Sequence, residues 1–194
     1  MPSKILVIDN YDSFTYNLVH LIQELVDDNV IIDVVRNDQI KIEAIEQYDT
    51  LILSPGPGIP DEAGNLKEII KEYAPKKKIL GVCLGQQAIG EVFGSQLKNL
   101  EEVFHGIETP MMLTEHSGKL FEGIPQTFQA GRYHSWVIDK STLTDKLMIT
   151  CTDEYDEIMA IKHRDYDVYA IQFHPESILT PDGETMMSNF LFKC

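Results

Sequence analysis

The first half of the chain alternates between short apolar runs and segments whose apolar residues recur at helical spacing. An unbroken apolar run such as Ile5 to Ile8 is typical of a strand buried on both faces of a parallel sheet. Apolar residues three and four positions apart, as from Phe14 to Leu25, indicate amphipathic helices. The pattern predicts strands at 5–8, 30–35, 50–53 and 78–82, and helices at 14–26, 42–45, 66–73 and 86–93. This alternation predicts a parallel sheet that is covered by helices on both faces.

The second half has a different pattern, because its apolar runs follow one another with only polar turns between them. Strands are predicted near 128 and at 137–138, 147–152, 158–162 and 168–173. Such closely spaced strands favour antiparallel additions to the sheet. Thr180-Pro181-Asp182 supplies a capping residue, a first-turn proline and a first-turn acid, and predicts a last helix that reaches Phe192. Residues 1–194 show no repeat or linker, so we expect a single domain with a three-layer α/β fold and a mostly parallel central sheet.

Charge and cysteine usage narrow the classes of function. The 194 residues carry a formal net charge of −15, which repels phosphate backbones and argues against binding of nucleic acid. The three cysteines, Cys83, Cys151 and Cys194, are odd in number and widely spaced, so a reducing cytoplasm is expected rather than a disulfide framework. The six histidines lack the spacing of metal ligands, and no apolar stretch approaches the length of a membrane span. We therefore expect a cytoplasmic protein without a metal site or membrane association.

One cysteine stands between two glycines at a predicted strand-to-helix junction. The sequence there is Gly81-Val82-Cys83-Leu84-Gly85. This is the pattern of a nucleophile elbow, with cysteine where hydrolases have serine. Glycine relieves the crowding in such a tight turn, and the N-terminus of the following helix favours a thiolate. Because a lone cysteine is more often an inert core residue, Cys83 is a candidate nucleophile that still needs a base.

The best candidate base is His174, which lies in Gln172-Phe173-His174-Pro175-Glu176 just after a predicted strand. Pro175 favours an extended conformation for His174, and residues i and i+2 of an extended segment share a face. Glu176 is therefore expected beside the imidazole, where a carboxylate fixes the tautomer. Nucleophile, base and orienting acid are then all present. His134 is an alternative base, although no carboxylate follows it at i+2.

A loop rich in proline and glycine follows the third predicted strand. Its sequence is Ser54-Pro55-Gly56-Pro57-Gly58-Ile59-Pro60, and it lacks the Lys-Ser/Thr ending of a phosphate-binding loop. Its backbone N–H groups and that of Leu84, directly after the nucleophile, could donate to an oxyanion. The alternative is a rigid turn without a ligand. Residues 10–15 and 132–136 could also line a pocket, but taken alone they favour a capping turn and an amphipathic strand.

Together, the elbow and the Phe173-His174-Pro175-Glu176 segment resemble the triad (class I) glutamine amidotransferases, with similarity from Lys4 to the C-terminal helix. The resemblance implies a flavodoxin-like α/β fold and a triad of Cys83, His174 and Glu176 that hydrolyses L-glutamine through a cysteinyl thioester. It also implies that Gly56, Pro57, Gly58 and Leu84 hold the oxyanion, and that Gln87 and the backbone of Ser135 and Trp136 bind the amino-acid end of glutamine.

Within this family, residues 9–15, Ser54 to Gly58 and Gln86-Gln87 resemble the branch that contains anthranilate synthase component II and the glutaminase subunit of aminodeoxychorismate synthase. The branch implies that ammonia passes to a chorismate-binding synthase subunit on another polypeptide, which also holds any Mg²⁺, so no cofactor is expected in this chain. The leading expectation is anthranilate synthase, in tryptophan biosynthesis. The alternatives are aminodeoxychorismate synthase, in folate biosynthesis, one subunit shared by both, an unpartnered hydrolase of γ-glutamyl compounds, and a non-catalytic binding module. Ile107 and Trp136 depart from the branch, which usually has lysine and leucine there.

Overall fold

The computed structural model describes residues 4–194, and its strands form one large sheet and one small sheet. The strands are β1 (Lys4–Asp9), β2 (Ile31–Arg36), β3 (Thr50–Leu53), β4 (Lys78–Val82), β5 (Leu97–Asn99), β6 (Ile107–Leu113), β7 (Thr127–Arg132), β8 (Trp136–Ile138), β9 (Leu147–Asp153), β10 (Ile158–His163) and β11 (Val168–Ile171). The large sheet has the order β2-β1-β3-β4-β11-β10-β9-β6-β7, and β5 pairs with β8 separately. The strands from β2 to β11 in this order are parallel, and the pairings from β11 to β7 are antiparallel.

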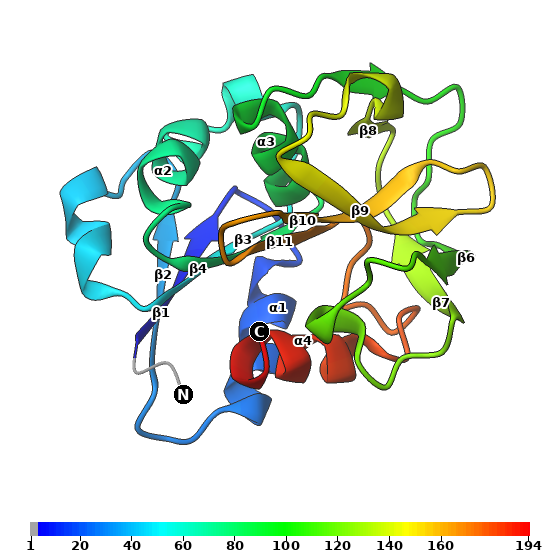
Figure 1. Cartoon of the computed structure of the whole chain (residues 1–194). Helices are drawn as coiled ribbons and strands as arrows, with labels where there is room; N and C mark the ends of the chain where they lie inside the picture. Colours follow the sequence, from blue (N-terminus) through cyan, green and yellow to red (C-terminus); the bar gives the residue numbers. More distant parts are fainter. Residues whose placement is uncertain (1–3) are drawn as a thin grey trace.

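Helices cover both faces of the parallel part of the sheet (Figure 1). They are α1 (Thr15–Leu25), α2 (Leu66–Tyr73), α3 (Leu84–Val92) and α4 (Gly183–Phe192). Successive residues of β1 point to opposite faces, so Ile5 and Val7 join one apolar cluster and Leu6 and Ile8 join the other. The first cluster contains the buried apolar residues of α1 and α4, and the second contains those of α2 and α3. The expected three-layer α/β arrangement is therefore confirmed.

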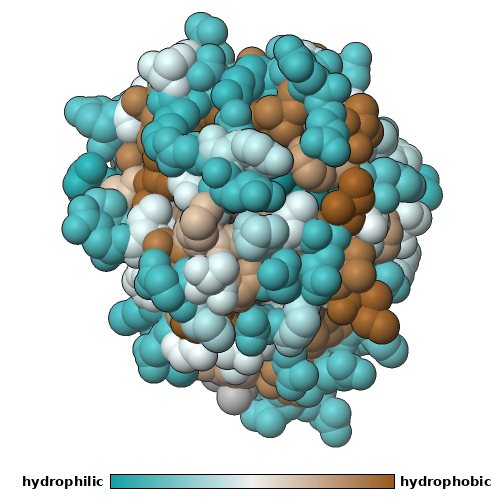
Figure 2. Space-filling model, turned by 90° about the vertical axis from the view of Figure 1, so that its right-hand side faces the viewer, coloured by the Kyte–Doolittle hydropathy of each residue, from teal (hydrophilic) through white to brown (hydrophobic). Residues whose placement is uncertain are grey.

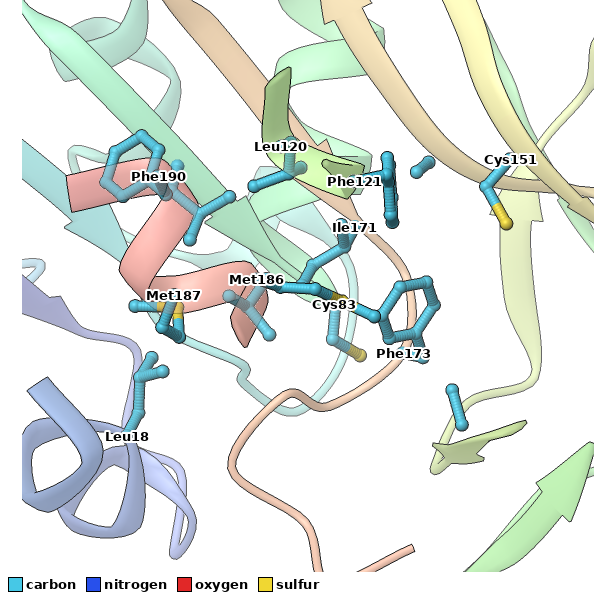
Figure 3. Packing of buried hydrophobic residues seen from close by; sticks show 14 of the residues in the cluster. Leu18, Cys83, Leu120, Phe121, Cys151, Ile171, Phe173, Met186, Met187 and Phe190 are labelled. Atoms are coloured by element: carbon cyan, nitrogen blue, oxygen red, sulfur yellow. The ribbon is translucent and has the colours of Figure 1, made fainter. Parts of the chain in front are cut away.

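The cluster under α1 and α4 reaches the candidate nucleophile. Figure 3 shows Leu18 of α1 on one side of this cluster and Met186, Met187 and Phe190 of α4 over the strands, with Cys83 at the end of β4. Close packing of this kind leaves little room for movement of the sheet beneath the site.

The elements predicted for the first half are confirmed. The strand β3, the helix α2 and the strand β4 have their predicted bounds, and the others differ by one or two residues at an end. The predicted short helix at 42–45 is a 3₁₀ helix over Ile42–Gln47. In the second half, the sequence pattern predicts β7 to β11 but not β5 and β6.

A proline interrupts the sequence of β6, so the pattern of apolar residues does not predict this strand. Proline lacks an N–H and is therefore tolerated only where a strand has no partner on that side. Pro110 pairs with Gln129 of β7, whereas the pairing of β6 with β9 begins one residue later, at Met111. The proline thus lies where β6 still has a single neighbour.

The predicted cap of the last helix is wrong. The helix α4 begins at Gly183, and the preceding Asp182 makes no capping hydrogen bond through its side chain. Thr180 Oγ1 instead donates to the carbonyl of His174 (2.6 Å) and accepts from the N–H of Gly131 (3.0 Å). This hydroxyl therefore ties the segment that carries His174 to β7.

The C-terminal ends of β1, β3 and β4 lie side by side, because these strands are parallel neighbours. Residues 10–14, residues 54–58 and Cys83 follow these three ends directly. Open parallel sheets bind ligands at this edge. The segments singled out from the sequence thus converge at one place in the fold.

The hydropathy of the surface is consistent with the acidic composition of the chain. Hydrophilic residues cover most of the face shown in Figure 2, in keeping with the net charge of −15. Over residues 4–194, none of the helices has both the length and the apolar character needed to cross a bilayer.

Candidate active site

Cys83 lies in the tight turn between β4 and α3. Its backbone has φ 53° and ψ −102°, a strained conformation for a residue with a side chain. A Cβ at Gly81 would lie 2.7 Å from the backbone oxygen of Gly85, and a Cβ at Gly85 would lie 2.6 Å from that of Leu53. Close backbone approaches therefore require both glycines. The turn places the thiol at the N-terminus of α3, where the helix dipole favours an anion.

His174 and Glu176 are paired by a turn rather than by an extended segment. His174 Nδ1 lies 2.7 Å from Glu176 Oε1, and both side chains are buried. The N–H of Ser177 donates to the carbonyl of His174 (3.2 Å), which closes a β-turn with Pro175 at its second position. The pairing is present, but the reason predicted for it, alternation along an extended chain, is wrong. Because the carboxylate engages Nδ1, the Nε2 atom remains for the sulfur.

Two aromatic rings hold the imidazole of His174. The ring centroids of Phe14 and Tyr133 lie 5.3 and 4.8 Å from that of His174. The hydroxyl of Tyr133 is 3.1 Å from Ser177 Oγ, which fixes the phenol ring in turn. Because His174 is only 1% exposed, its ring cannot rotate without displacing these neighbours.

Opposing effects set the charge of His174. Burial by itself lowers the pKa of the imidazole, because the charged form loses its hydration. Interactions with Cys83 and Glu176 outweigh burial and raise the pKa to about 10. Within residues 4–194, Nε2 makes no well-aligned hydrogen bond, as is common for catalytic pairs before substrate binds. A charged imidazolium beside the sulfur favours the thiolate, which is the nucleophilic form of cysteine.

Buried polar groups tie residues 54–58 to the end of β1. Asn10 donates from its backbone N–H to Ser54 Oγ (2.9 Å) and from Nδ2 to the carbonyl of Ser54 (2.7 Å). A Cβ at Gly56 would lie 2.5 Å from Leu84 Cδ2 and 2.6 Å from Asn10 Cβ. The loop therefore lies directly against the start of α3, and only glycine permits this approach.

A cavity of about 160 Å³ opens beside Cys83. Its lining brings together residues that are distant in sequence: Gly56, Pro57, Gly58, Cys83, Gln87, Tyr133, His134, Ser135 and Trp136. His174 and Glu176 do not line it, and they meet the site through Cys83. The cavity is smaller than the roughly 300–1,000 Å³ of pockets for drug-sized ligands, which suits a free amino acid.

Leu84 is the one expected substrate-binding residue that does not line the cavity. Its side chain is buried in the core under α2 and α3. The role predicted for it needs only its backbone N–H, which lies in the first turn of α3. An N–H at that position has no acceptor within its own helix and remains available to an oxyanion.

The side chain of Gln87 is partly committed to the protein. Its Nε2 donates to the carbonyl of Trp136 (3.0 Å) and to Oε1 of Gln172 (3.1 Å). Its oxygen has no partner in the described part of the chain and remains free for a ligand. Gln172 in turn donates from Nε2 to Cys83 Sγ (3.4 Å). The sequence pattern alone does not single out Gln172, although its place two residues before His174 is an available signal.

The backbone of Ser135 and Trp136 offers fewer groups to a ligand than predicted. The carbonyl of Ser135 accepts from the N–H of Leu100 (2.7 Å), and that of Trp136 accepts from Gln87 and from His134. Both carbonyls are therefore engaged within the protein. Any backbone contact from these residues to a ligand is left to their N–H groups.

His134, the alternative base, has both ring nitrogens engaged. Arg132 Nε can only donate, so His134 Nε2 accepts from it (3.0 Å), and the Nδ1–H donates to the carbonyl of Trp136 (3.1 Å). Burial and the charge of Arg132 lower the pKa of His134 to about 3. Because this ring is neutral and has no free nitrogen, His174 is the better base for Cys83.

Known proteins resemble this chain over nearly its whole length. The family model of glutamine amidotransferase class-I matches residues 6–194. An aminodeoxychorismate/anthranilate synthase component 2 from Bacillus subtilis is 47% identical over 190 residues, which are 96% of this chain and 95% of that protein. A bifunctional protein, TrpGD, from Thermotoga maritima is 41% identical over 191 residues. That match covers 97% of this chain and 32% of the longer protein, so the chain spans about a third of this relative.

A solved structure supports the fold. A protein from Thermoplasma acidophilum, described as a putative GMP synthase subunit, superposes with a TM-score of 0.86 and 28% sequence identity. The superposition covers 98% of this chain and 93% of that chain. The fold expected from the sequence is therefore confirmed by an independent relative.

Proposed function

This chain belongs to the class-I glutamine amidotransferases, and from that premise we propose that it is the glutaminase subunit of anthranilate synthase. In this role it supplies ammonia to a chorismate-binding subunit in tryptophan biosynthesis. The meeting of Cys83, His174 and Glu176 beside a small cavity is the observation that carries the proposal. A second candidate is the glutaminase of aminodeoxychorismate synthase, in folate biosynthesis, or one subunit that serves both. It is favoured by the name of the Bacillus subtilis relative, which covers both activities.

The first half of the proposed reaction releases ammonia. The thiolate of Cys83 attacks the side-chain carbonyl carbon of L-glutamine, and the carbonyl oxygen becomes an oxyanion. Backbone N–H groups of Gly56 to Gly58 and of Leu84 stabilise this oxyanion. When the tetrahedral intermediate collapses, the carbon–nitrogen bond breaks and His174 gives its proton to the leaving nitrogen. The products are ammonia and a glutamyl thioester on Cys83.

The second half regenerates the enzyme. His174, now neutral, takes a proton from water, and the resulting hydroxide attacks the thioester carbon. The carbon–sulfur bond breaks, glutamate leaves, and Cys83 returns to the thiolate. Glu176 keeps the ring oriented through Nδ1 and stabilises the imidazolium in both halves. Gln87 Oε1 and the N–H groups of Ser135 and Trp136 hold the amino-acid end of the substrate.

Exposed apolar side chains beside the site support the proposal that a partner subunit docks there. Large side chains with apolar character are exposed on the segments that flank the site: Tyr11 is 47% exposed, Tyr16 is 68% exposed and Ile178 is 95% exposed. Aromatic and apolar side chains of this kind are enriched in protein interfaces. The partner in this proposal is the chorismate-binding subunit, which would also bind any Mg²⁺ that the synthase reaction requires.

The proposed compartment is the cytoplasm. Its support is the free state of the thiols of Cys83, Cys151 and Cys194. Reduced thiols persist in the cytosol, where glutathione and thioredoxin keep disulfides rare.

Reconstitution with each candidate synthase subunit tests the function. With anthranilate synthase component I, the wild-type chain and glutamine should yield anthranilate, and Cys83→Ala should abolish this product. The same mixture supplied with an ammonium salt should still form anthranilate, because the chemistry of the partner is separate. Cys151→Ala is the matched control, since it removes another buried sulfur that does not line the cavity.

Three results would contradict the proposal. If the Cys83→Ala complex also lost ammonia-driven synthesis, the cysteine would be structural rather than nucleophilic. If the chain supported only aminodeoxychorismate formation with the other subunit, the second candidate would replace the first. High glutaminase activity of the isolated chain, with no increase on adding either subunit, would indicate an unpartnered hydrolase.

A further inference from the structure

Gln172 is a buried polar residue that contacts the reactive sulfur. It follows β11 and precedes His174 by two residues, and it is 0% exposed. Its backbone N–H is already paired with the carbonyl of Met159 (2.8 Å), so the side chain is not needed to satisfy its own backbone. Its Nε2 lies 3.4 Å from Cys83 Sγ. A buried amide is costly unless it is hydrogen-bonded, and here one of its two ends faces sulfur.

The neighbouring hydrogen bonds determine which end of the Gln172 amide faces the sulfur. The carbonyl of Trp136 can only accept, so Gln87 must present its amide nitrogen there. The same nitrogen points at Gln172, which must therefore offer its oxygen to Gln87. The nitrogen of Gln172 is then left for Cys83. The carbonyl of Trp136 therefore fixes the orientation of the Gln87 amide, and the Gln87 amide fixes that of Gln172.

A second donor to the carbonyl of Trp136 strengthens this assignment. Arg132, which has no acceptor, donates to His134 Nε2, and this leaves the proton of His134 on Nδ1, aimed at the same carbonyl. Both lone pairs of the carbonyl are thus engaged by donors. No rearrangement of Gln87 preserves these bonds while turning the oxygen of Gln172 toward the sulfur.

We propose that Gln172 is a further catalytic residue, which donates a hydrogen bond from Nε2 to the thiolate of Cys83 and stabilises it before attack. No covalent bond forms or breaks in this step. The inference rests on the proposed role of Cys83 as nucleophile, and it assigns to Gln172 a share of the stabilisation that His174 and the N-terminus of α3 also provide.

The hydrogen bond has two opposite kinetic effects. A bond to a charged acceptor is strong enough to change the fraction of thiolate by about tenfold, which is about one pH unit. The same stabilisation makes each thiolate less nucleophilic, by roughly threefold for a tenfold change in basicity. Loss of the bond should therefore shift reactivity to higher pH and raise the rate that is reached once all sulfur is ionised.

Alkylation of the isolated wild-type chain by iodoacetamide as a function of pH tests this, with the modified residue identified by peptide mapping. In Gln172→Met, which keeps the bulk and removes the donor, the inflection of the pH–rate profile should rise by about one unit. The plateau rate should rise by roughly threefold. Gln86→Met is the matched control, because Gln86 is equally buried on α3 and its amide makes no hydrogen bond within residues 4–194.

Gln172→Glu distinguishes loss of the hydrogen bond to Cys83 from a change in packing around the sulfur. Its carboxylate has the shape of the amide and can still accept from Gln87, but it repels a thiolate instead of donating to it. The inflection should therefore lie higher in Gln172→Glu than in Gln172→Met. An inflection that stays at the wild-type pH in both variants would overturn the proposal while leaving the nucleophile in place. Failure of the wild-type chain to react at Cys83 at any pH would overturn the proposed nucleophile together with this inference.

Discussion

Replacement of Arg132 by methionine should strongly destabilise the fold. Arg132 and Asp153 are each 1% exposed, and Arg132 Nη1 lies 2.8 Å from Asp153 Oδ2. The guanidinium carbon also lies 3.6 Å from the ring centroid of Phe104, which adds a cation–π contact. Its Nε holds His134 at the wall of the cavity. Arg132→Met therefore leaves a buried carboxylate without its counter-charge and a buried imidazole without its donor.

The magnitude follows from what remains around Asp153. Removing one member of a buried ion pair costs about 3–5 kcal/mol, because the other charge is left uncompensated. Asp153 Oδ1 keeps the backbone N–H groups of Tyr155 (3.0 Å) and Glu157 (2.9 Å), so only Oδ2 is orphaned. We therefore expect the lower end, about 3 kcal/mol. For a chain of this length, that corresponds to a fall in Tm of roughly 6–12 °C.

Equilibrium unfolding of the isolated chain in urea at neutral pH measures this cost. The matched control is Lys193→Met, which breaks the ion pair between Lys193 and Glu122. These two side chains are 46% and 60% exposed, respectively. An exposed pair contributes only about 0–1 kcal/mol. If Arg132→Met lost no more free energy of unfolding than Lys193→Met, the claim that Arg132 and Asp153 form a structural ion pair would be refuted.

Two other predictions follow from the geometry of the site. Gly56→Ala should lower kcat for glutamine by about 100- to 1,000-fold in the reconstituted complex. The reason is that the new Cβ would overlap Leu84 and Asn10 and displace an oxyanion donor. Normal glutamine turnover by this variant would contradict the prediction. His134→Asn should flatten the pH dependence of stability. Burial and the charge of Arg132 lower the folded-state pKa of His134 to about 3, so the unfolded state binds more protons below pH 6.5 and wild-type stability falls as the pH falls toward 3. Between pH 7 and 5 the wild type should lose roughly 2 kcal/mol more than the variant in urea unfolding, and equal losses would contradict the assigned burial.

Local sequence determined the parts of this protein that depend on near neighbours. The apolar run from Ile5 to Ile8 makes β1 a buried strand whatever its partners are, because both faces of a parallel strand must be covered. The glycines at 81 and 85 indicate a tight turn around Cys83, since each approaches backbone too closely for a side chain. The pairing of His174 with Glu176 spans only two residues and was predictable, although a turn and not an extended segment produces it.

Only the tertiary structure decided which distant groups meet these residues. Gln172 reaches Cys83 across 89 positions of the chain, and Gln87 reaches Trp136 across 49. No sequence periodicity encodes such contacts, because they depend on the order of strands in the sheet. The strand β11 lies far from β4 in sequence, yet it is the parallel neighbour of β4 in the sheet. The choice between His134 and His174 also depended on tertiary structure. Arg132, whose Nε occupies His134 Nε2, is only two positions from His134 in sequence, but its guanidinium is buried by the fold and paired with Asp153, 21 positions away.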